Sequence, residues 1–147
     1  MNRVLLSATL LAACTAHSPT ANNTPAPTAA PSVQAALESR PNWDEARAHG
    51  VDFRAIGQEP GWMLDIHQHD HIVLLWDYGE RLFTFPLADP AYPQEGLTRY
   101  RTEAGGHTLE IDIRRYPCQD AMNGEAFPAR VEVRIDGRLL QGCGRSV

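Results

Sequence analysis

The second half of the chain alternates between apolar and polar residues with the period of two that is typical of β-strands. The alternating apolar positions are Leu109, Ile111 and Ile113 in one segment and Val131, Val133 and Ile135 in another. Successive side chains of a strand point to opposite faces of a sheet, so this pattern buries one face and exposes the other. Both segments are therefore predicted to be half-buried strands with a solvated polar face.

Shorter apolar runs, separated by turn residues, extend the pattern along the chain. Further strands are predicted at 53–56, 62–66, 72–77, 82–87, 97–102 and 139–140. Gly105-Gly106 and Tyr78-Gly79-Glu80 separate neighbouring runs, and Asp136-Gly137 is typical of a two-residue type I′ hairpin. A short helix is expected over residues 41–50, with Gly50 at its end.

About eight short antiparallel strands favour an all-β fold, either a small barrel or a rolled sheet whose curling removes exposed edges. With one short N-terminal helix and one disulfide, this is the predicted fold of a single domain over residues 41–147. A barrel of this size is filled by its own side chains. The predicted interior residues are Trp62, Leu64, Ile66, Val73, Leu75, Phe83, Phe85, Leu109, Ile111, Ile113, Val131, Val133 and Ile135.

The N-terminal residues combine a short cationic start with an apolar run that ends at Cys14. Leu11-Ala12-Ala13-Cys14 resembles the bacterial lipobox, in which the cysteine becomes the acylated first residue of the mature protein. The run is shorter than the roughly 20 residues that a membrane-spanning helix needs. Residues 1–13 are therefore predicted to be a lipoprotein signal peptide and Cys14 the lipidation site. The alternative is an ordinary cleaved signal peptide followed by a coincidental cysteine.

Residues 14–40 are rich in Pro, Ala, Thr and Asn and have no periodic apolar face. Such a segment cannot bury enough apolar surface to order itself, so a disordered tether is predicted between the lipid and the domain. Acyl chains on Cys14 would hold the protein in the cell envelope. An aspartate directly after the acylated cysteine would resemble an inner-membrane retention signal. This chain has Thr15 at that position, which favours an anchor in the outer membrane, facing the periplasm.

The charge and the residues that are missing narrow the classes of function. The net charge is −5, and loss of Arg3 with a signal peptide makes it one unit more negative, so nucleic acid is not an expected partner. All 13 basic residues are arginines, which excludes a lysine nucleophile. Serines are absent from the predicted strands, so a serine nucleophile elbow has no place. Neither an enzyme nor a bound cofactor is expected.

Once Cys14 is set aside, Cys118 and Cys143 form an even pair. In an exported protein such a pair is typical of a disulfide, and a loop of about 25 residues would be worth roughly 3 kcal/mol. Free or metal-binding thiols are the alternative.

Three local patterns follow one another along the chain. They are Arg54-Ala55-Ile56-Gly57-Gln58-Glu59-Pro60-Gly61-Trp62, Cys118-Gln119-Asp120-Ala121-Met122-Asn123-Gly124 with Phe127-Pro128, and Leu140-Gln141-Gly142-Cys143-Gly144. After a lipobox, this order resembles a family of uncharacterised proteobacterial envelope lipoproteins marked by G-x-EPGW and a C-terminal GCG. The resemblance covers roughly residues 53 to 144. It implies an envelope location but no reaction.

The layout is more distantly similar to META-domain lipoproteins and to the membrane-bound inhibitors of c-type lysozyme, which are small disulfide-stapled β-barrels. The inhibitors insert a loop of pattern S-G-x-x-Y into the lysozyme cleft, aided by a lysine. The matching stretch here is Asn123-Gly124-Glu125-Ala126-Phe127. Asn123 and Phe127 replace the serine and the tyrosine, and Arg130 or Arg134 would have to replace the lysine.

Glu59-Pro60-Gly61-Trp62 is predicted to be a type II turn, with the positive φ at Gly61 and Trp62 at the start of a strand. The alternative places Glu59 and Trp62 in a surface patch that grips a partner. Asp120 is expected to cap a short turn that runs to Met122.

Residues 67–71 contain three histidines, His67, His69 and His71, together with Asp70. Imidazole and carboxylate groups are ligands that Zn²⁺, Cu²⁺ or Ni²⁺ accept. The flanking apolar runs place them at a hairpin tip, where solvation explains them equally well. Metal binding there is an alternative function.

The arginines at 99, 101, 114 and 115 either form a basic stripe or, as we favour, pair across strands with Glu103, Glu110 and Asp112.

The predicted function is that of a lipid-anchored binding or envelope-maintenance protein that contacts an envelope protein through the 118–128 loop. The expected contact residues are Asn123, Gly124, Glu125, Phe127, Glu59 and Trp62. Inhibition of c-type lysozyme through this loop is the first alternative.

Overall fold

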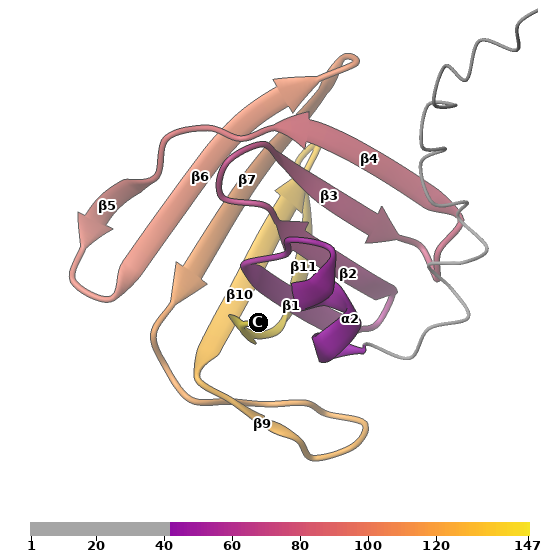
Figure 1. The fold of residues 1–147 in the computed structure, drawn as a ribbon, viewed down its shortest axis with the longest axis vertical. Coiled ribbons are helices and arrows are strands. Elements are labelled where there is room, and N and C mark those ends of the chain that lie inside the picture. Colours follow the sequence, from indigo (N-terminus) through magenta and orange to yellow (C-terminus); the bar gives the residue numbers. More distant parts are fainter. Residues whose placement is uncertain (1–41) are drawn as a thin grey trace, which may run out of the picture.

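The computed structural model describes residues 42–147 (Figure 1). The predicted signal peptide, the lipidation site at Cys14 and the tether over 14–40 lie outside the described residues. Among residues 42–147, no helix has the length and apolar character that crossing a bilayer requires.

One short helix precedes a run of antiparallel strands. The helix is α2 (Trp43–Ala48), and the strands are β1 (Phe53–Gln58), β2 (Gly61–Ile66), β3 (His71–Trp76), β4 (Arg81–Pro86), β5 (Ala91–Gln94), β6 (Leu97–Ala104), β7 (His107–Arg114), β8 (Cys118–Gln119), β9 (Ala126–Phe127), β10 (Ala129–Ile135) and β11 (Arg138–Ser146). Nine strands form one sheet in the order β4-β3-β2-β1-β11-β10-β7-β6-β5, and β8 pairs with β9. The predicted all-β fold is confirmed.

The sheet curls into a half-barrel in which β4 crosses the upper part of β6 (Figure 1). The Thr102 hydroxyl donates a hydrogen bond of 2.9 Å to the carbonyl oxygen of Pro86, which joins β6 to the end of β4. Exposed strand edges invite pairing with other chains, and curling brings the end of β4 against β6. The other edge strand, β5, is short and contains Pro93, which limits pairing in the same way.

The inner face of the half-barrel holds the main apolar core. Its buried members are Ala55, Trp62, Leu64, Ile66, Ile72, Leu74, Trp76, Phe85, Tyr100, Leu109, Ile111, Val131, Val133, Ile135 and Leu140. Phe83 and Ile113, both predicted to be interior residues, are partly buried and pack against this core. Most of the predicted interior is therefore confirmed.

The prediction of which β3 side chains point inward is wrong by one position. Leu64 is a core residue and pairs directly with Leu74, so Ile72, Leu74 and Trp76 point inward. Val73 and Leu75 lie on the outer face. Residues 72–76 are all apolar, so alternation cannot show which side of this strand is buried. The pairing register with β2 decides it.

Helix α2 packs on the outer face of the sheet, near β1 and β2 (Figure 1). The side-chain oxygen of Asn42 caps it by accepting from the backbone N–H groups of Asp44 and Glu45 at 3.2 Å. The helix is shorter than the predicted span of 41–50. A second apolar cluster lies beneath it, made of Ile56, Cys118, Phe127 and Cys143 with Trp43 and Met63.

Two predicted turns can be compared with the structure. Asp136 and Gly137 both have positive φ, 49° and 81°, and Ile135 pairs with Arg138, so the two-residue type I′ hairpin is confirmed. The type II turn at Glu59-Pro60 is wrong. The bond between Glu59 and Pro60 is cis, Gly61 lacks a positive φ, and Gln58 pairs with Gly61. Proline is thus the second residue of a two-residue loop, where a type II turn does not place it.

Candidate functional site

The three sequence patterns that are far apart in the chain meet at one cleft. The cleft has a volume of about 390 Å³ and lies between the β1–β2 turn, the segment after β8, and the strands β10 and β11. Its lining residues are Ile56, Gly57, Gln58, Glu59, Cys118, Gln119, Asp120, Ala121, Arg130, Gln141, Gly142 and Cys143. We call it the motif cleft. It contains residues of the EPGW segment, of the 118–124 segment and of the GCG segment.

Trp62 supports the motif cleft from the core side. A Cβ atom at Gly57 would collide with the Trp62 indole, and one at Gly142 would collide with the carbonyl oxygen of Ile56 and with the same indole. The indole N–H donates to the carbonyl oxygen of Gln141 at 3.3 Å. Trp62 is 5% exposed, so the expectation that it contacts a partner is corrected: the two glycines make room for it inside the fold.

A disulfide fastens β8 to strand β11 of the sheet. Cys118 and Cys143 are bonded, with a Cα–Cα distance of 5.5 Å, as predicted. The short hairpin of β8 and β9 projects from one end of the sheet (Figure 1) and pairs Cys118 with Phe127. Residues 120–125 form the connection between the two short strands. We call them the disulfide loop.

Asp120 organises the disulfide loop. Its Oδ1 accepts hydrogen bonds from the backbone N–H groups of Met122 at 2.8 Å and Asn123 at 3.1 Å, which confirms the predicted cap. Its Oδ2 accepts from the Gln58 side chain at 2.7 Å, which ties the loop to β1. Burial opposes ionisation of Asp120, but the hydrogen bonds from Gln58 and from the two backbone N–H groups outweigh it, so the pKa of this carboxyl lies below its ordinary value.

The structure divides the predicted contact residues into exposed and buried ones. Asn123 and Gly124 are exposed at the disulfide loop, and the side-chain oxygen of Asn123 accepts from the backbone N–H of Glu125 at 2.8 Å. Glu125 is half-buried and pairs with Arg145 at 3.1 Å. Phe127 is 3% exposed, so it is corrected from a contact residue to a packing residue. Its ring lies 5.7 Å from that of Trp43.

The burial of Phe127 bears on the likeness to lysozyme inhibitors. Phe127 stands at the tyrosine position of the S-G-x-x-Y pattern, yet it faces the apolar cluster under α2. The Asn123 amide oxygen, at the serine position, is engaged within the loop. The loop tip instead presents Met122, which is 71% exposed.

Glu59 is exposed at the rim of the motif cleft. One of its carboxylate oxygens accepts a hydrogen bond of 2.8 Å from the Tyr78 hydroxyl of the neighbouring β3–β4 turn. This bond raises the pKa of the Tyr78 hydroxyl, because the neutral phenol is the form that donates. The other oxygen of Glu59 remains as an acceptor for a ligand.

Arg130, which the sequence offered only as one of two replacements for the lysine of the lysozyme inhibitors, lines the motif cleft. It is exposed, and its guanidinium lies 5.9 Å from the centre of the Tyr116 ring. On the sheet it pairs directly with Arg114 of β7. Within residues 42–147 no carboxylate pairs with Arg130, whereas Arg114 reaches Asp112 at 3.4 Å.

The histidine segment is a hairpin tip between β2 and β3, as predicted. The rings of His67 and His71 stack at 4.2 Å, and Asp70 bonds to Nδ1 of His71 at 2.7 Å. Burial and the neighbouring His71 lower the pKa of His67. In the described part of the chain, no group of three or more His, Cys, Asp or Glu side chains is placed to hold a metal ion, so His69 does not complete a site with the stacked pair.

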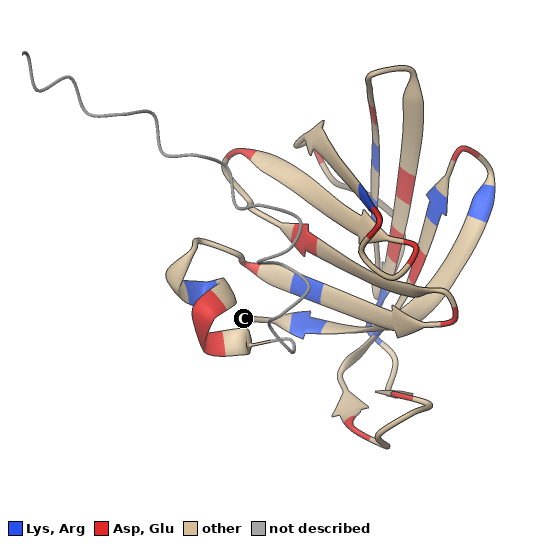
Figure 2. Cartoon of the chain, turned by 90° about the vertical axis from the view of Figure 1, so that its right-hand side faces the viewer, with Lys and Arg blue, Asp and Glu red and all other residues tan. Residues whose placement is uncertain are grey.

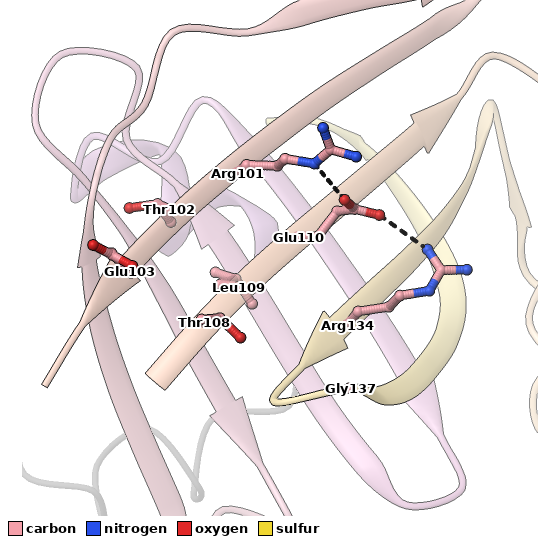
Figure 3. Close-up of a pocket in the computed structure, with 8 residues that line it drawn as sticks. All are labelled: Arg101, Thr102, Glu103, Thr108, Leu109, Glu110, Arg134 and Gly137. Carbon is pink, nitrogen blue, oxygen red and sulfur yellow. Dashed lines mark hydrogen bonds and ion pairs between the residues drawn. The ribbon is translucent and has the colours of Figure 1, made fainter. Parts of the chain in front are cut away.

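A second hollow of about 490 Å³ lies on the outer face of β6, β7 and β10 (Figure 3). Glu110 stands between Arg101 and Arg134, with distances of 2.5 Å and 3.3 Å. Nearby, Asp112 is 1% exposed and accepts two hydrogen bonds from Arg99 at 2.5 and 2.6 Å, which hold the pKa of its carboxyl below the ordinary value. The predicted pairing across strands is confirmed for Arg99 with Asp112 and for Arg101 with Glu110, whereas Arg114 reaches Asp112 of its own strand and neither Arg115 nor Glu103 forms an ion pair within residues 42–147. We call Arg99, Arg101, Glu110, Asp112, Glu132 and Arg134 the paired face.

The chain matches no protein-family model, no curated protein and no solved structure.

Proposed function

We propose that this protein is a lipid-anchored protein of the bacterial envelope that binds a partner through the motif cleft and the disulfide loop beside it. The single observation that carries the proposal is the convergence of the three sequence patterns at this cleft. They supply its turn, its loop and its floor, although 60 to 80 residues separate the first pattern from the other two in the chain, as the pairs Gln58–Asp120 and Trp62–Gln141 illustrate.

Preorganisation supports the proposal. The disulfide loop is fixed at three places: the bond between Cys118 and Cys143, the hydrogen bond from Gln58 to Asp120, and the ion pair of Glu125 with Arg145. A surface that is already ordered loses less conformational entropy when it binds, which favours affinity. Met122 at the tip offers an exposed apolar side chain of the adaptable kind that is common in binding surfaces.

The location in the proposal comes from the lipobox at Leu11-Ala12-Ala13-Cys14 and the tether that follows it. Two or more acyl chains give stable membrane attachment, since each buried methylene contributes about 0.8 kcal/mol. A disulfide in the domain agrees with an oxidising compartment such as the periplasm.

Photo-crosslinking in intact cells tests the proposal. A benzophenone amino acid replaces Met122 in one version and Tyr92 of β5 in the control version; these side chains are 71% and 69% exposed. The control site lies on a strand at the far edge of the sheet. Discrete crosslinked species are expected from position 122 and not from position 92. Equal yields at the two positions, or no species at position 122, would refute the disulfide loop as part of the contact surface, and with it the proposal that the cleft and the loop bind the partner together.

A further inference from the structure

The motif cleft contains one cationic side chain, Arg130, that forms no ion pair with a carboxylate of residues 42–147. Arg130 and Arg114 are direct cross-strand partners, an arrangement in which like charges destabilise a sheet. Asp112, the nearest carboxylate to Arg114, already holds Arg99 at 2.5 and 2.6 Å. Arg130 has no carboxylate partner among the described residues. An anion bound beside Arg130 would offset this repulsion.

The stacking partner of Arg130 holds the guanidinium at the cleft. The Tyr116 ring lies 5.9 Å from the guanidinium carbon, within the range of a cation–π contact. Such a contact leaves the N–H groups available, and a planar guanidinium donates two parallel hydrogen bonds to a carboxylate. Arg130 is the one cationic side chain among the lining residues of the motif cleft in the described chain.

The other walls of the cleft are rich in acceptors. Gln119 donates to the carbonyl oxygen of Gly124 at 3.1 Å, and Gln141 donates to Glu132 at 3.2 Å. Each contact uses one of the two N–H groups of the amide, so the amide oxygen and the second N–H of both residues remain for a ligand. The second carboxylate oxygen of Glu59 adds a further acceptor at the rim. One cation beside several acceptors matches a peptide, whose backbone supplies N–H donors and whose end supplies a carboxylate.

We infer that the motif cleft binds the carboxylate end of a peptide, with Arg130 holding the carboxylate and the Gln119, Gln141 and Glu59 oxygens accepting from peptide N–H groups. This inference rests on the proposed function and names its partner class. A phosphate-bearing membrane surface fits less well, because it presents many negative charges to a cleft that Glu59 and Asp120 also line, whereas a peptide end carries a single carboxylate.

The test uses the full chain in detergent micelles and a defined pair of probes. The probes are N-acetyl-trialanine with a free carboxylate and the same peptide with a C-terminal amide. NMR follows the Arg130 side-chain N–H and the side-chain amides of Gln119 and Gln141 during titration. We expect saturable shifts with the carboxylate peptide and affinity about tenfold or more lower for the amide, because a charge-assisted bidentate contact is lost.

Two variants of the chain and a titration with inorganic phosphate complete the test. Arg130→Gln is expected to reduce binding of the carboxylate peptide about tenfold or more, while Arg101→Gln on the paired face leaves it unchanged. Equal binding of the two peptides, or unchanged binding by Arg130→Gln, would overturn the inference. Inorganic phosphate that binds as well as the peptide would overturn the assignment to peptides.

The two proposals fail in different ways. Crosslinks at position 122 without peptide binding would leave the contact surface standing and remove its carboxylate ligand. Peptide binding without crosslinks at position 122 would support a ligand site at the motif cleft and remove the adjoining disulfide loop from the contact surface.

Discussion

The two hollows of the outer surface both contain arginine and acidic side chains, and they differ in how these charges are paired. On the paired face, Arg101, Glu110 and Arg134 form a continuous chain of ion pairs, and residues of both signs lie next to one another along the strands (Figures 2 and 3). In the motif cleft, Arg130 faces Arg114 and has no acidic partner within the described residues. The ion pairs of the larger hollow therefore serve stability, whereas the smaller hollow holds a guanidinium without an ion-pair partner in the described residues.

This difference shows why volume alone does not identify a site. The hollow of about 490 Å³ is larger than the motif cleft of about 390 Å³. Arg101, Glu110 and Arg134 already satisfy one another, so a ligand that binds to these side chains would have to break an existing pair. The motif cleft offers a guanidinium and several oxygens whose hydrogen-bonding capacity is only partly used.

The largest expected effect comes from removing the disulfide, which should disrupt the motif cleft before the paired face. Cys118→Ser with Cys143→Ser frees a segment with a separation of 25 residues, and the expected loss is about 2–5 kcal/mol of unfolding free energy. Urea unfolding measures this loss. Hydrogen exchange should show residues 118–127 losing protection more than β6 and β7. Unchanged unfolding under reducing agent would contradict this expectation.

Asp112→Asn should be the most damaging single change on the paired face. The carboxylate is buried and holds Arg99, so its loss leaves a partly buried guanidinium without its partner, at an expected cost of about 2–4 kcal/mol. Glu110→Gln is the matched control: its side chain is more exposed, and the expected cost is about 1 kcal/mol or less. Equal losses in urea unfolding would show that burial does not set the strength of these pairs.

Asp112 also predicts a dependence of stability on pH. Hydrogen bonds from Arg99 lower the pKa of this carboxyl in the folded state below its ordinary value of about 4. The unfolded chain therefore binds the proton more readily as the pH falls, so this contribution is present above pH about 4 and is lost as the pH drops through the folded pKa. Urea unfolding between pH 7 and 3 should show a smaller acid loss in Asp112→Asn than in the native chain. Parallel profiles would contradict the assignment.

In the motif cleft, Asp120→Asn should loosen the disulfide loop with a smaller effect on the whole fold. The change weakens the charge-assisted hydrogen bonds from Gln58 and the loop backbone, at an expected cost of about 1–2 kcal/mol. Hydrogen exchange of the Met122 and Asn123 amides should speed up in this variant. Unchanged exchange at these amides would show that Asp120 does not order the loop.

Local pattern predicted the elements better than the site. The alternation at 109–113 and 131–135 is visible in the chain because the outer residues are charged, so β7 and β10 and their inner faces are correct. Residues 72–76 are apolar on both faces, and their inward side depends on pairing with β2. The prediction of a type II turn at Glu59-Pro60 is wrong for a similar reason. The pairing of Gln58 with Gly61 leaves only Glu59 and Pro60 in the loop, and local sequence does not show this pairing.

The site could be predicted only in part, because it depends on contacts between residues that are far apart in the chain. The motif residues Glu59, Asn123 and Gly124 were expected at a surface, and they are exposed there. Nothing local shows that Gln58 reaches Asp120 across 62 positions, or that Arg130 meets Arg114 on the neighbouring strand. Trp62 and Phe127 are aromatic residues of the kind that is common in contact surfaces, and only the packed structure shows that they are buried.

The smallest expected effect gives the most direct test of the comparison, because its sign decides the outcome. Arg101→Gln removes an exposed ion pair and should lower the unfolding free energy by about 0.2–1 kcal/mol. Arg130→Gln removes one of two directly opposed like charges and should leave that free energy unchanged or raise it by up to about 1 kcal/mol.

Urea unfolding of the two variants beside the native chain, at low ionic strength and neutral pH, is the measurement. Opposite signs, or a loss confined to Arg101→Gln, are the predicted result, because only Arg101 is paired within the fold. A loss of unfolding free energy in Arg130→Gln as large as that in Arg101→Gln would contradict the central claim that Arg130 is held for a ligand.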